Sequence, residues 1–170
     1  NTSYVSYANF SPDGLKVITA SSDNTSKIWD VSSGNLLQTL TGHTGCVYSA
    51  SFSPDGKRVV TAYCDNTVKI WDISSGELLQ TLTGHTHSVY SANFSPDGLR
   101  VVTASEDNTA KIWDSQSGEL LHTLEGHTSY VRSANFSPDG LKVITASSDD
   151  TAKIWDVSSD NLLQTLTGHT

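Results

Sequence analysis

The sequence predicts an all-β fold built from four tandem modules, each a sheet of four short antiparallel strands. Tryptophan recurs every 42 residues, at Trp29, Trp71, Trp113 and Trp155. The motif FSPDG recurs with the same spacing, beginning at Phe10, Phe52, Phe94 and Phe136. Short runs of alternating apolar and polar residues separate the turn-forming residues, which is the pattern of half-buried strands. The repeat divides the chain into modules 1–42, 43–84, 85–126 and 127–168.

The first half of the third module predicts two strands joined by a tight turn. VYSANF (89–94) is apolar at alternate positions, as expected of the first strand. Pro96-Asp97-Gly98 follows, in which Pro fixes φ and Gly permits a positive φ. LRVVTAS (99–105) is rich in β-branched residues and predicts the second strand.

The second half of the module predicts another pair of strands. Asp107-Asn108 turns the chain into AKIWD (110–114), the third strand. ELLHTL (119–124) is the fourth strand, and it follows Ser117-Gly118. No stretch of the sequence combines helical periodicity with a capping residue, so we expect no helix.

Four-stranded antiparallel modules that repeat at about 42 residues are typical of the blades of a β-propeller. One such sheet cannot bury both of its faces. Stacked neighbours bury these faces, and a closed ring removes the open ends. We therefore expect β-propeller blades in a single domain, residues 1–170.

The chain resembles the WD-repeat β-propeller family over its whole length. Two recurring dipeptides carry the resemblance. One is glycine-histidine, at Gly42-His43, Gly84-His85, Gly126-His127 and Gly168-His169. The other is tryptophan-aspartate, at Trp29-Asp30, Trp71-Asp72, Trp113-Asp114 and Trp155-Asp156.

The resemblance implies a structural hydrogen-bond network in each blade. It would join a histidine before the innermost strand, a Ser or Thr of the second strand, an Asp of the next turn and the Trp of the third strand. Blades 3 and 4 have all four, at His85, Ser105, Asp107, Trp113 and at His127, Ser147, Asp149, Trp155. Blade 2 has His43, Asp65 and Trp71, but Tyr63 replaces the serine. Blade 1 has Ser21, Asp23 and Trp29, but Asn1 stands at the histidine position.

Four blades are expected to form half of a ring. A four-bladed ring needs about 90° per blade and an eight-bladed ring about 45°, and nothing in the modules indicates the stronger wedge. Each outer blade would then expose a face of about 400 Å² of apolar area, which corresponds to about 10 kcal/mol before association costs. Such patches do not stay bare on soluble monomers. We therefore predict a head-to-tail homodimer that closes an eight-bladed ring.

The ends of the chain fit this homodimer. His169-Thr170 repeat the register of Asn1-Thr2, so His169 of one chain would complete the network of Ser21, Asp23 and Trp29 in the other. The alternative is that residues 169–170 are only a boundary of the piece. The sequence contains no methionine, so we expect it to be a piece of a longer protein. A fragment that assembles but has no physiological ligand is an alternative function.

Differences between the modules gather at module positions 3, 4, 6, 7, 21 and 22. These positions should cluster at one end of the blades, around the mouth of the channel, where the resembled family commonly binds partners. Tyr and Arg are favoured at interfaces. The candidate partner-binding residues are Tyr4, Tyr48, Cys64, Tyr90, Glu106, Tyr130 and Arg132. Drift at positions that the scaffold leaves free is the alternative.

The repeated His, Ser and Asp have the composition of a catalytic triad. An active site, however, needs one exposed nucleophile beside an oxyanion hole, whereas this set recurs in register together with a Trp. We expect a scaffold and no enzyme; a propeller enzyme that uses the channel mouth is the alternative. His85-Thr86-His87 could supply two metal ligands, but no third is signalled, so we expect no metal and no cofactor.

Composition narrows the classes of partner. The net charge of −8 argues against nucleic acid and anionic membranes, and no apolar run approaches the roughly 18 residues of a membrane span. Cys46 and Cys64 are too few for a disulfide framework. They fall at the same end of one blade, where they either form a disulfide or are two independent residues. We expect reduced cytosol as the compartment. The predicted function is a non-enzymatic protein-interaction scaffold that binds itself and an unidentified protein or peptide.

Overall fold

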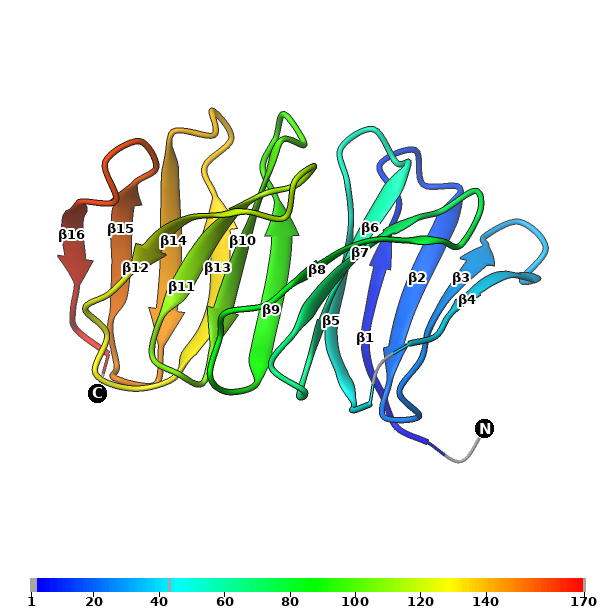
Figure 1. The fold of residues 1–170 in the computed structure, drawn as a ribbon, viewed down its shortest axis with the longest axis horizontal. Helices are drawn as coiled ribbons and strands as arrows, with labels where there is room; N and C mark the ends of the chain where they lie inside the picture. The colour runs from blue at the N-terminus through cyan, green and yellow to red at the C-terminus, as the bar shows by residue number, and fades with distance from the viewer. Residues whose placement is uncertain (1–2, 43, 170) are drawn as a thin grey trace.

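A computed structural model describes residues 3–42 and 44–169, and within these residues the chain is all-β, as predicted. Sixteen strands form four separate sheets, and in each sheet four antiparallel strands lie side by side in chain order (Figure 1). Blade 1 contains β1 (Val5–Phe10), β2 (Lys16–Ser21), β3 (Ser26–Asp30) and β4 (Leu36–Leu40). Blade 2 contains β5 (Val47–Phe52), β6 (Arg58–Tyr63), β7 (Val68–Asp72) and β8 (Leu78–Leu82). Blade 3 contains β9 (Val89–Phe94), β10 (Arg100–Ser105), β11 (Ala110–Asp114) and β12 (Leu120–Leu124). Blade 4 contains β13 (Val131–Phe136), β14 (Lys142–Ser147), β15 (Ala152–Asp156) and β16 (Leu162–Leu166).

The turns between strands are closed by short polar side chains. In blade 3, the Asp97 carboxylate accepts hydrogen bonds from the Ser95 hydroxyl and from the backbone N–H of Leu99, at 2.5 and 3.0 Å. Gly98 has a φ of +72°, which explains why glycine ends this motif. The next turn places Asn108 at a φ of +69°, a region that Asn adopts more readily than most residues.

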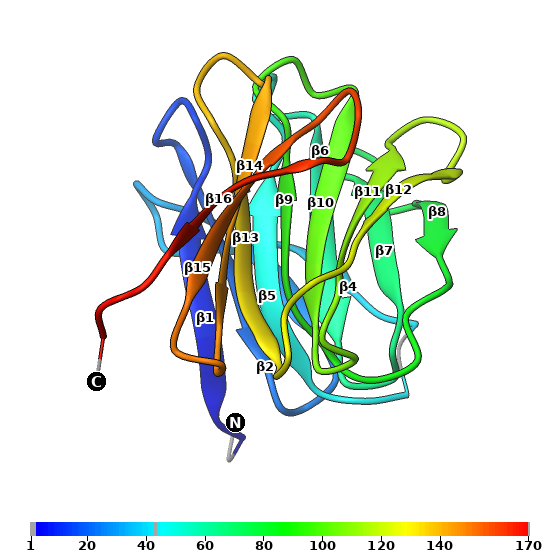
Figure 2. The same ribbon diagram turned by 90° about the vertical axis from the view of Figure 1, so that its left-hand side faces the viewer.

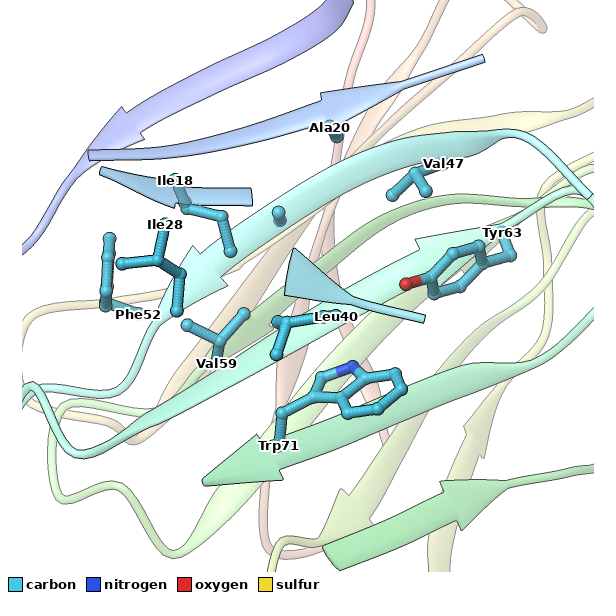
Figure 3. Close-up of a cluster of buried hydrophobic side chains, with 10 residues drawn as sticks. Ile18, Ala20, Ile28, Leu40, Val47, Phe52, Val59, Tyr63 and Trp71 are labelled. Atoms are coloured by element: carbon cyan, nitrogen blue, oxygen red, sulfur yellow. The ribbon is translucent and has the colours of Figure 1, made fainter. Parts of the chain in front are cut away.

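The blades stack through three hydrophobic clusters, one at each junction between neighbours. We call the face of a blade that packs against the following blade its rear face, and the opposite face its front face. At the first junction the rear face of blade 1 contributes Ile18, Ala20, Ile28 and Leu40. The front face of blade 2 contributes Val47, Ala50, Phe52, Val59 and Trp71 (Figure 3). The same positions, one repeat further along, form the second and third junctions. Each sheet therefore buries both faces only where it has a neighbour on both sides.

The four blades form an open row with the two termini at opposite ends (Figure 1). Neighbouring inner strands lie against each other in the order β1, β5, β9, β13. Figure 2 looks onto blade 4, and no other sheet covers its rear face. The front face of blade 1 and the rear face of blade 4 are therefore the two uncovered ends of the row.

Candidate interaction surfaces

A chain of hydrogen bonds crosses blade 3 and joins the segment before β9, strands β10 and β11, and the turn between these two strands. His85 contacts the Asp107 carboxylate through Nδ1 and the Thr103 hydroxyl through Nε2, both at 2.7 Å. The indole N–H of Trp113 donates to the same hydroxyl at 2.9 Å. Blade 4 repeats this chain through His127, Asp149, Thr145 and Trp155, at 2.7, 2.8 and 2.9 Å. With Nδ1 protonated, each histidine donates to the aspartate and accepts from the threonine.

The hydroxyl at the centre of this chain is Thr103 or Thr145, which corrects the assignment of Ser105 and Ser147. The Ser105 hydroxyl instead donates to the backbone carbonyl of Ser88 at 2.9 Å and accepts from the N–H of Asp107 at 3.1 Å. Ser147 makes the same kind of contacts with Ser129 and Asp149. These serines tie the turn to the inner strand. A threonine two residues earlier recurs in every module, at 19, 61, 103 and 145, whereas the serine position holds Tyr63 in blade 2; this recurrence is the signal that could have pointed to the threonine.

Blades 1 and 2 contain the tryptophan–threonine part of the chain. Trp29 donates to Thr19 at 2.9 Å and Trp71 to Thr61 at 2.8 Å. Asp23 and Asp65 accept hydrogen bonds from the threonines of their own turns, at 2.6 Å. Ser21 accepts from the backbone N–H of Asp23 at 3.2 Å. His43 lies outside the described residues, and His169 is exposed at the C-terminal end.

The carboxylates of this chain are held in the charged form. Burial alone would raise the pKa of Asp107, but hydrogen bonds from His85 and Thr109 outweigh it and hold that pKa well below its usual range. The Asp107 side chain is only 8% exposed. Asp149 behaves in the same way. Burial raises its pKa, but hydrogen bonds from Thr151 and His127 lower it by more, so the pKa lies well below its usual range.

This chain of hydrogen bonds has the chemistry of a scaffold. The Thr103 hydroxyl is fully buried, so a substrate cannot reach it, and both nitrogens of His85 are already in hydrogen bonds. Within residues 3–42 and 44–169, no three His, Cys, Asp or Glu side chains lie close enough together to hold a metal ion.

Aromatic side chains gather at the opposite end of the blades from the FSPDG turns. The rings of Tyr48 and Tyr90 are 5.5 Å apart, and the Arg132 guanidinium lies 4.8 Å from the centre of the Tyr90 ring. It also lies 5.4 Å from the centre of the Tyr130 ring, while its Nε donates to Ser148 at 2.8 Å. We call Tyr4, Tyr48, Tyr90, Tyr130 and Arg132 the aromatic rim.

A hollow of about 470 Å³ opens within the aromatic rim. Its lining residues are Tyr4, Ser6, Ser22, Cys46, Val47, Tyr48, Tyr90 and Arg132. The structure thus brings four of the predicted partner-binding residues to one hollow, and Tyr130 joins them through Arg132. Glu106 and Cys64 lie at the same end but outside this lining.

Two tyrosines of the rim keep their phenol protons over a wide pH range. A hydrogen bond with Cys46, together with burial, raises the pKa of Tyr48 to about 12. Burial and the nearby Glu106 charge raise the pKa of Tyr90, and Arg132 opposes them. Both phenols are therefore uncharged at neutral pH, and the Tyr90 phenol can donate a hydrogen bond to a bound molecule.

The two uncovered faces carry apolar side chains at the positions that their buried counterparts use, but they lack a neighbour. Ile144 of blade 4 is 43% exposed and Leu166 is 41% exposed, whereas Ile18 and Leu40, at the same positions of blade 1, are fully buried. On the front face of blade 1, Val5 is 57% exposed and Val47 is fully buried. The rear face of blade 4 therefore has the surface that every inner junction buries, and so does the front face of blade 1.

A glycine marks each junction. Gly42, Gly84 and Gly126 each lie against the indole of the next blade, where an added Cβ would be 3.5, 3.2 and 3.3 Å from the ring. Gly168 has a similar positive φ, but nothing lies within 4 Å of the position that its Cβ would take.

The described residues contain no helix that is long and apolar enough to span a membrane.

Comparisons with known proteins agree with this architecture. A family model described as "IFT122 first beta-propeller" matches residues 46–170, and one described as "WD domain, G-beta repeat" matches residues 1–30. A 49-residue segment is 41% identical to "Guanine nucleotide-binding protein subunit beta-5b" of Danio rerio. That segment covers 29% of this chain and 12% of the relative.

Proposed function

This chain belongs to the WD-repeat β-propeller family, and from that premise we propose that it is a non-enzymatic scaffold that closes into a ring by self-assembly. Proteins with WD-repeat propellers generally mediate protein–protein interaction. The observation that carries the proposal is the pair of uncovered apolar faces at the two ends of the row. They are the two halves of a junction that the chain already forms three times.

The occupant of each face is a second copy of this chain. The rear face of blade 4 presents Ile144, Ala146, Ala152, Ile154 and Leu166, which correspond to the residues that blades 1 to 3 bury against a following blade. The front face of blade 1 presents Val5, Ala8, Phe10, Val17 and Trp29, which correspond to the other half of each buried cluster. A copy placed head to tail therefore meets a matching surface.

Two copies are the number that closes a ring with two-fold symmetry. Four blades per chain in an open row give eight blades in a dimer, within the usual range of propellers. Both uncovered faces of both chains are then covered, at two equivalent junctions. His169 of each chain would lie beside Thr19, Asp23 and Trp29 of the other, the blade 1 counterparts of Thr103, Asp107 and Trp113.

The test of self-assembly is the mass of the protein in solution. We expect light scattering at micromolar concentration to give twice the 18.2 kDa of one chain. Ile144→Asp places a charge on the rear face of blade 4 and should give single chains. Leu163→Asp is the matched control, because this leucine position is 39–48% exposed in all four blades, whether or not another blade follows.

A wild-type mass of one chain at micromolar concentration would contradict the proposal. So would a growing series of larger masses, because it would mean that the junctions propagate as an open filament instead of closing.

The surface for other proteins is the aromatic rim. Tyr4, Tyr130 and Arg132 of the rim are exposed, and Tyr48 and Tyr90 are half-buried. Tyr and Arg are residue types that dominate binding energy at interfaces, and the hollow offers a concave centre. The rim lies at one end of the blades, whereas ring closure covers the broad faces of blades 1 and 4, so we expect that end of the ring to stay accessible.

A displayed library of random peptides, selected on the immobilised protein, tests this second surface. We expect the selected peptides to lose at least tenfold in affinity for Arg132→Ala or Tyr90→Ala, which corresponds to about 1.4 kcal/mol or more. His122→Ala on an outer strand is the control and should bind normally. Peptides that bind all three variants equally would place the interaction elsewhere.

A further inference from the structure

Two cysteines face each other across the inner strand pair of blade 2. Val47 of β5 and Tyr63 of β6 are register partners. Cys46 precedes Val47 and Cys64 follows Tyr63, so the two cysteines lie opposite each other just beyond the ends of the strands. The backbone N–H of Cys64 donates to the carbonyl of Cys46 at 3.1 Å. Opposed residues of an antiparallel pair have Cα atoms roughly 4.5–5.5 Å apart, and a disulfide needs roughly 4.4–6.8 Å. The backbone of this pair therefore lies in the range of a disulfide.

Gly45 makes room for the sulfur of Cys64. A Cβ built on Gly45 would collide with Cys64 Sγ, so the sulfur lies directly over the residue that precedes Cys46. The equivalent positions hold Ser3, His87 and Ser129 in the other blades. Glycine at this position and cysteine at both partner positions occur together in blade 2 alone.

The same backbone pairing exists in the other blades without the thiols. The N–H groups of Ser22, Glu106 and Ser148 donate to the carbonyls of Tyr4, Ser88 and Tyr130, each at 2.9 Å. The scaffold thus needs no cysteine at either place. The thiols are an addition to a framework that forms equally well with other residues.

Both cysteines are half-buried, but only one of them lines the hollow. Cys46 lines the hollow of the aromatic rim, whereas Cys64 lies outside that lining. Burial, followed by its contact with Cys46, raises the pKa of the Cys64 thiol. Cys46 is therefore the thiol that a molecule bound in the hollow contacts, and Cys64 lies beside it as the second thiol.

We propose that Cys46 and Cys64 form a dithiol site that oxidised glutathione, or another small disulfide of that class, converts into an intrachain disulfide. The Cys46 thiolate attacks one sulfur of the small disulfide, a mixed disulfide forms, and one glutathione thiolate leaves with a proton. Cys64 then loses its proton and attacks the Cys46 sulfur, and the second glutathione leaves. Two cysteine thiols are oxidised and one glutathione disulfide is reduced to two thiols.

The experiment measures thiols and mass on the full chain in mixtures of oxidised and reduced glutathione. After the remaining thiols are alkylated, we expect wild type to lose both free thiols and to give a peptide crosslinked between residues 46 and 64 of one chain. Cys64→Ser should instead stop at the mixed disulfide and keep one glutathione on Cys46. Cys46→Ser should react more slowly, because its remaining thiol lies outside the hollow.

Gly45→Ser is the matched test of geometry, because serine occupies this position in two other blades. We expect it to leave the fold and both thiols intact but to slow the second step roughly tenfold or more, since its side chain displaces the Cys64 sulfur. Wild type that holds two glutathiones without a crosslink, or thiols that do not react, would overturn the proposal. A Gly45→Ser variant that closes as fast as wild type would overturn the role of the glycine.

Discussion

At the scale of single residues, the buried threonine matters more than the serine that the sequence predicted. Thr103 and Ser105 lie two positions apart on β10, so their side chains point to the same face of the sheet. Periodicity therefore cannot choose between them. Which hydroxyl joins the network depends on how far the Trp113 indole extends from the neighbouring strand. Its nitrogen lies 2.9 Å from the Thr103 hydroxyl oxygen. The histidine, aspartate and tryptophan of this network could be assigned from their spacing, and its central hydroxyl could not.

Replacing the two hydroxyls separately should reveal this difference. Thr103→Val leaves His85 and Trp113 buried without their shared partner, so we expect unfolding free energy to fall by about 3 kcal/mol. Ser105→Ala loses the hydrogen bonds that tie the turn to the inner strand, and we expect a loss of about 1 kcal/mol. Urea unfolding measures both. A larger loss in Ser105→Ala would contradict the central place of Thr103.

Acid should weaken the fold through the aspartates beside the histidines. The pKa values of Asp107 and Asp149 are lowered in the folded protein, so their contribution is fully present above the unfolded value of about 3.9. It is lost as pH falls below that value toward the folded one. We expect the free energy of unfolding to decrease between about pH 4 and pH 2, and Asp107→Asn to make that decrease shallower. Urea unfolding at several pH values measures this dependence. An unfolding free energy that falls equally steeply with pH in wild type and in Asp107→Asn would contradict the explanation.

At the scale of strands and turns, the sequence predicted the elements closely because each turn has its own chemical marker. The predicted strands 89–94 and 110–114 match β9 and β11, and the predicted strands 99–105 and 119–124 each begin one residue before β10 and β12. What the sequence could not show was the pairing of faces. Second strands such as LRVVTAS carry apolar side chains on both sides, so alternation alone does not say which side meets the preceding blade.

One turn departs from its siblings and offers a test at this scale. The turn before β16 has Asp160 at a φ of +54°, where the other blades have Gly34, Gly76 and Gly118 with φ of +70° to +75°. Glycine adopts this region without steric cost. We expect Asp160→Gly to raise the unfolding free energy by about 0.5–1 kcal/mol, measured by urea unfolding. Ser159→Gly, one residue earlier, is the control, and an equal gain there would refute the explanation.

At the scale of the whole molecule, the junction glycines report whether the ends of the row are covered. In a closed dimer, Gly168 would lie against Trp29 of the other chain as Gly126 lies against Trp155. We expect Gly168→Ala to raise the dimer dissociation constant at least tenfold, measured by sedimentation equilibrium. Gly34→Ala is the control, because it carries a positive φ with nothing within 4 Å and lies in a turn. Equal dissociation constants for the two variants would argue against closure.

The three junctions are built from equivalent side chains, and this uniformity has a consequence for how the molecule comes together during synthesis. A rear face cannot distinguish its own next blade from the blade of another nascent chain. Only the short tether between consecutive blades makes the correct neighbour the nearest one, through an effective concentration of the order of millimolar. Pairing of blades from different chains should therefore increase when many nascent chains are made close together. Refolding at low protein concentration should favour pairing of consecutive blades within one chain.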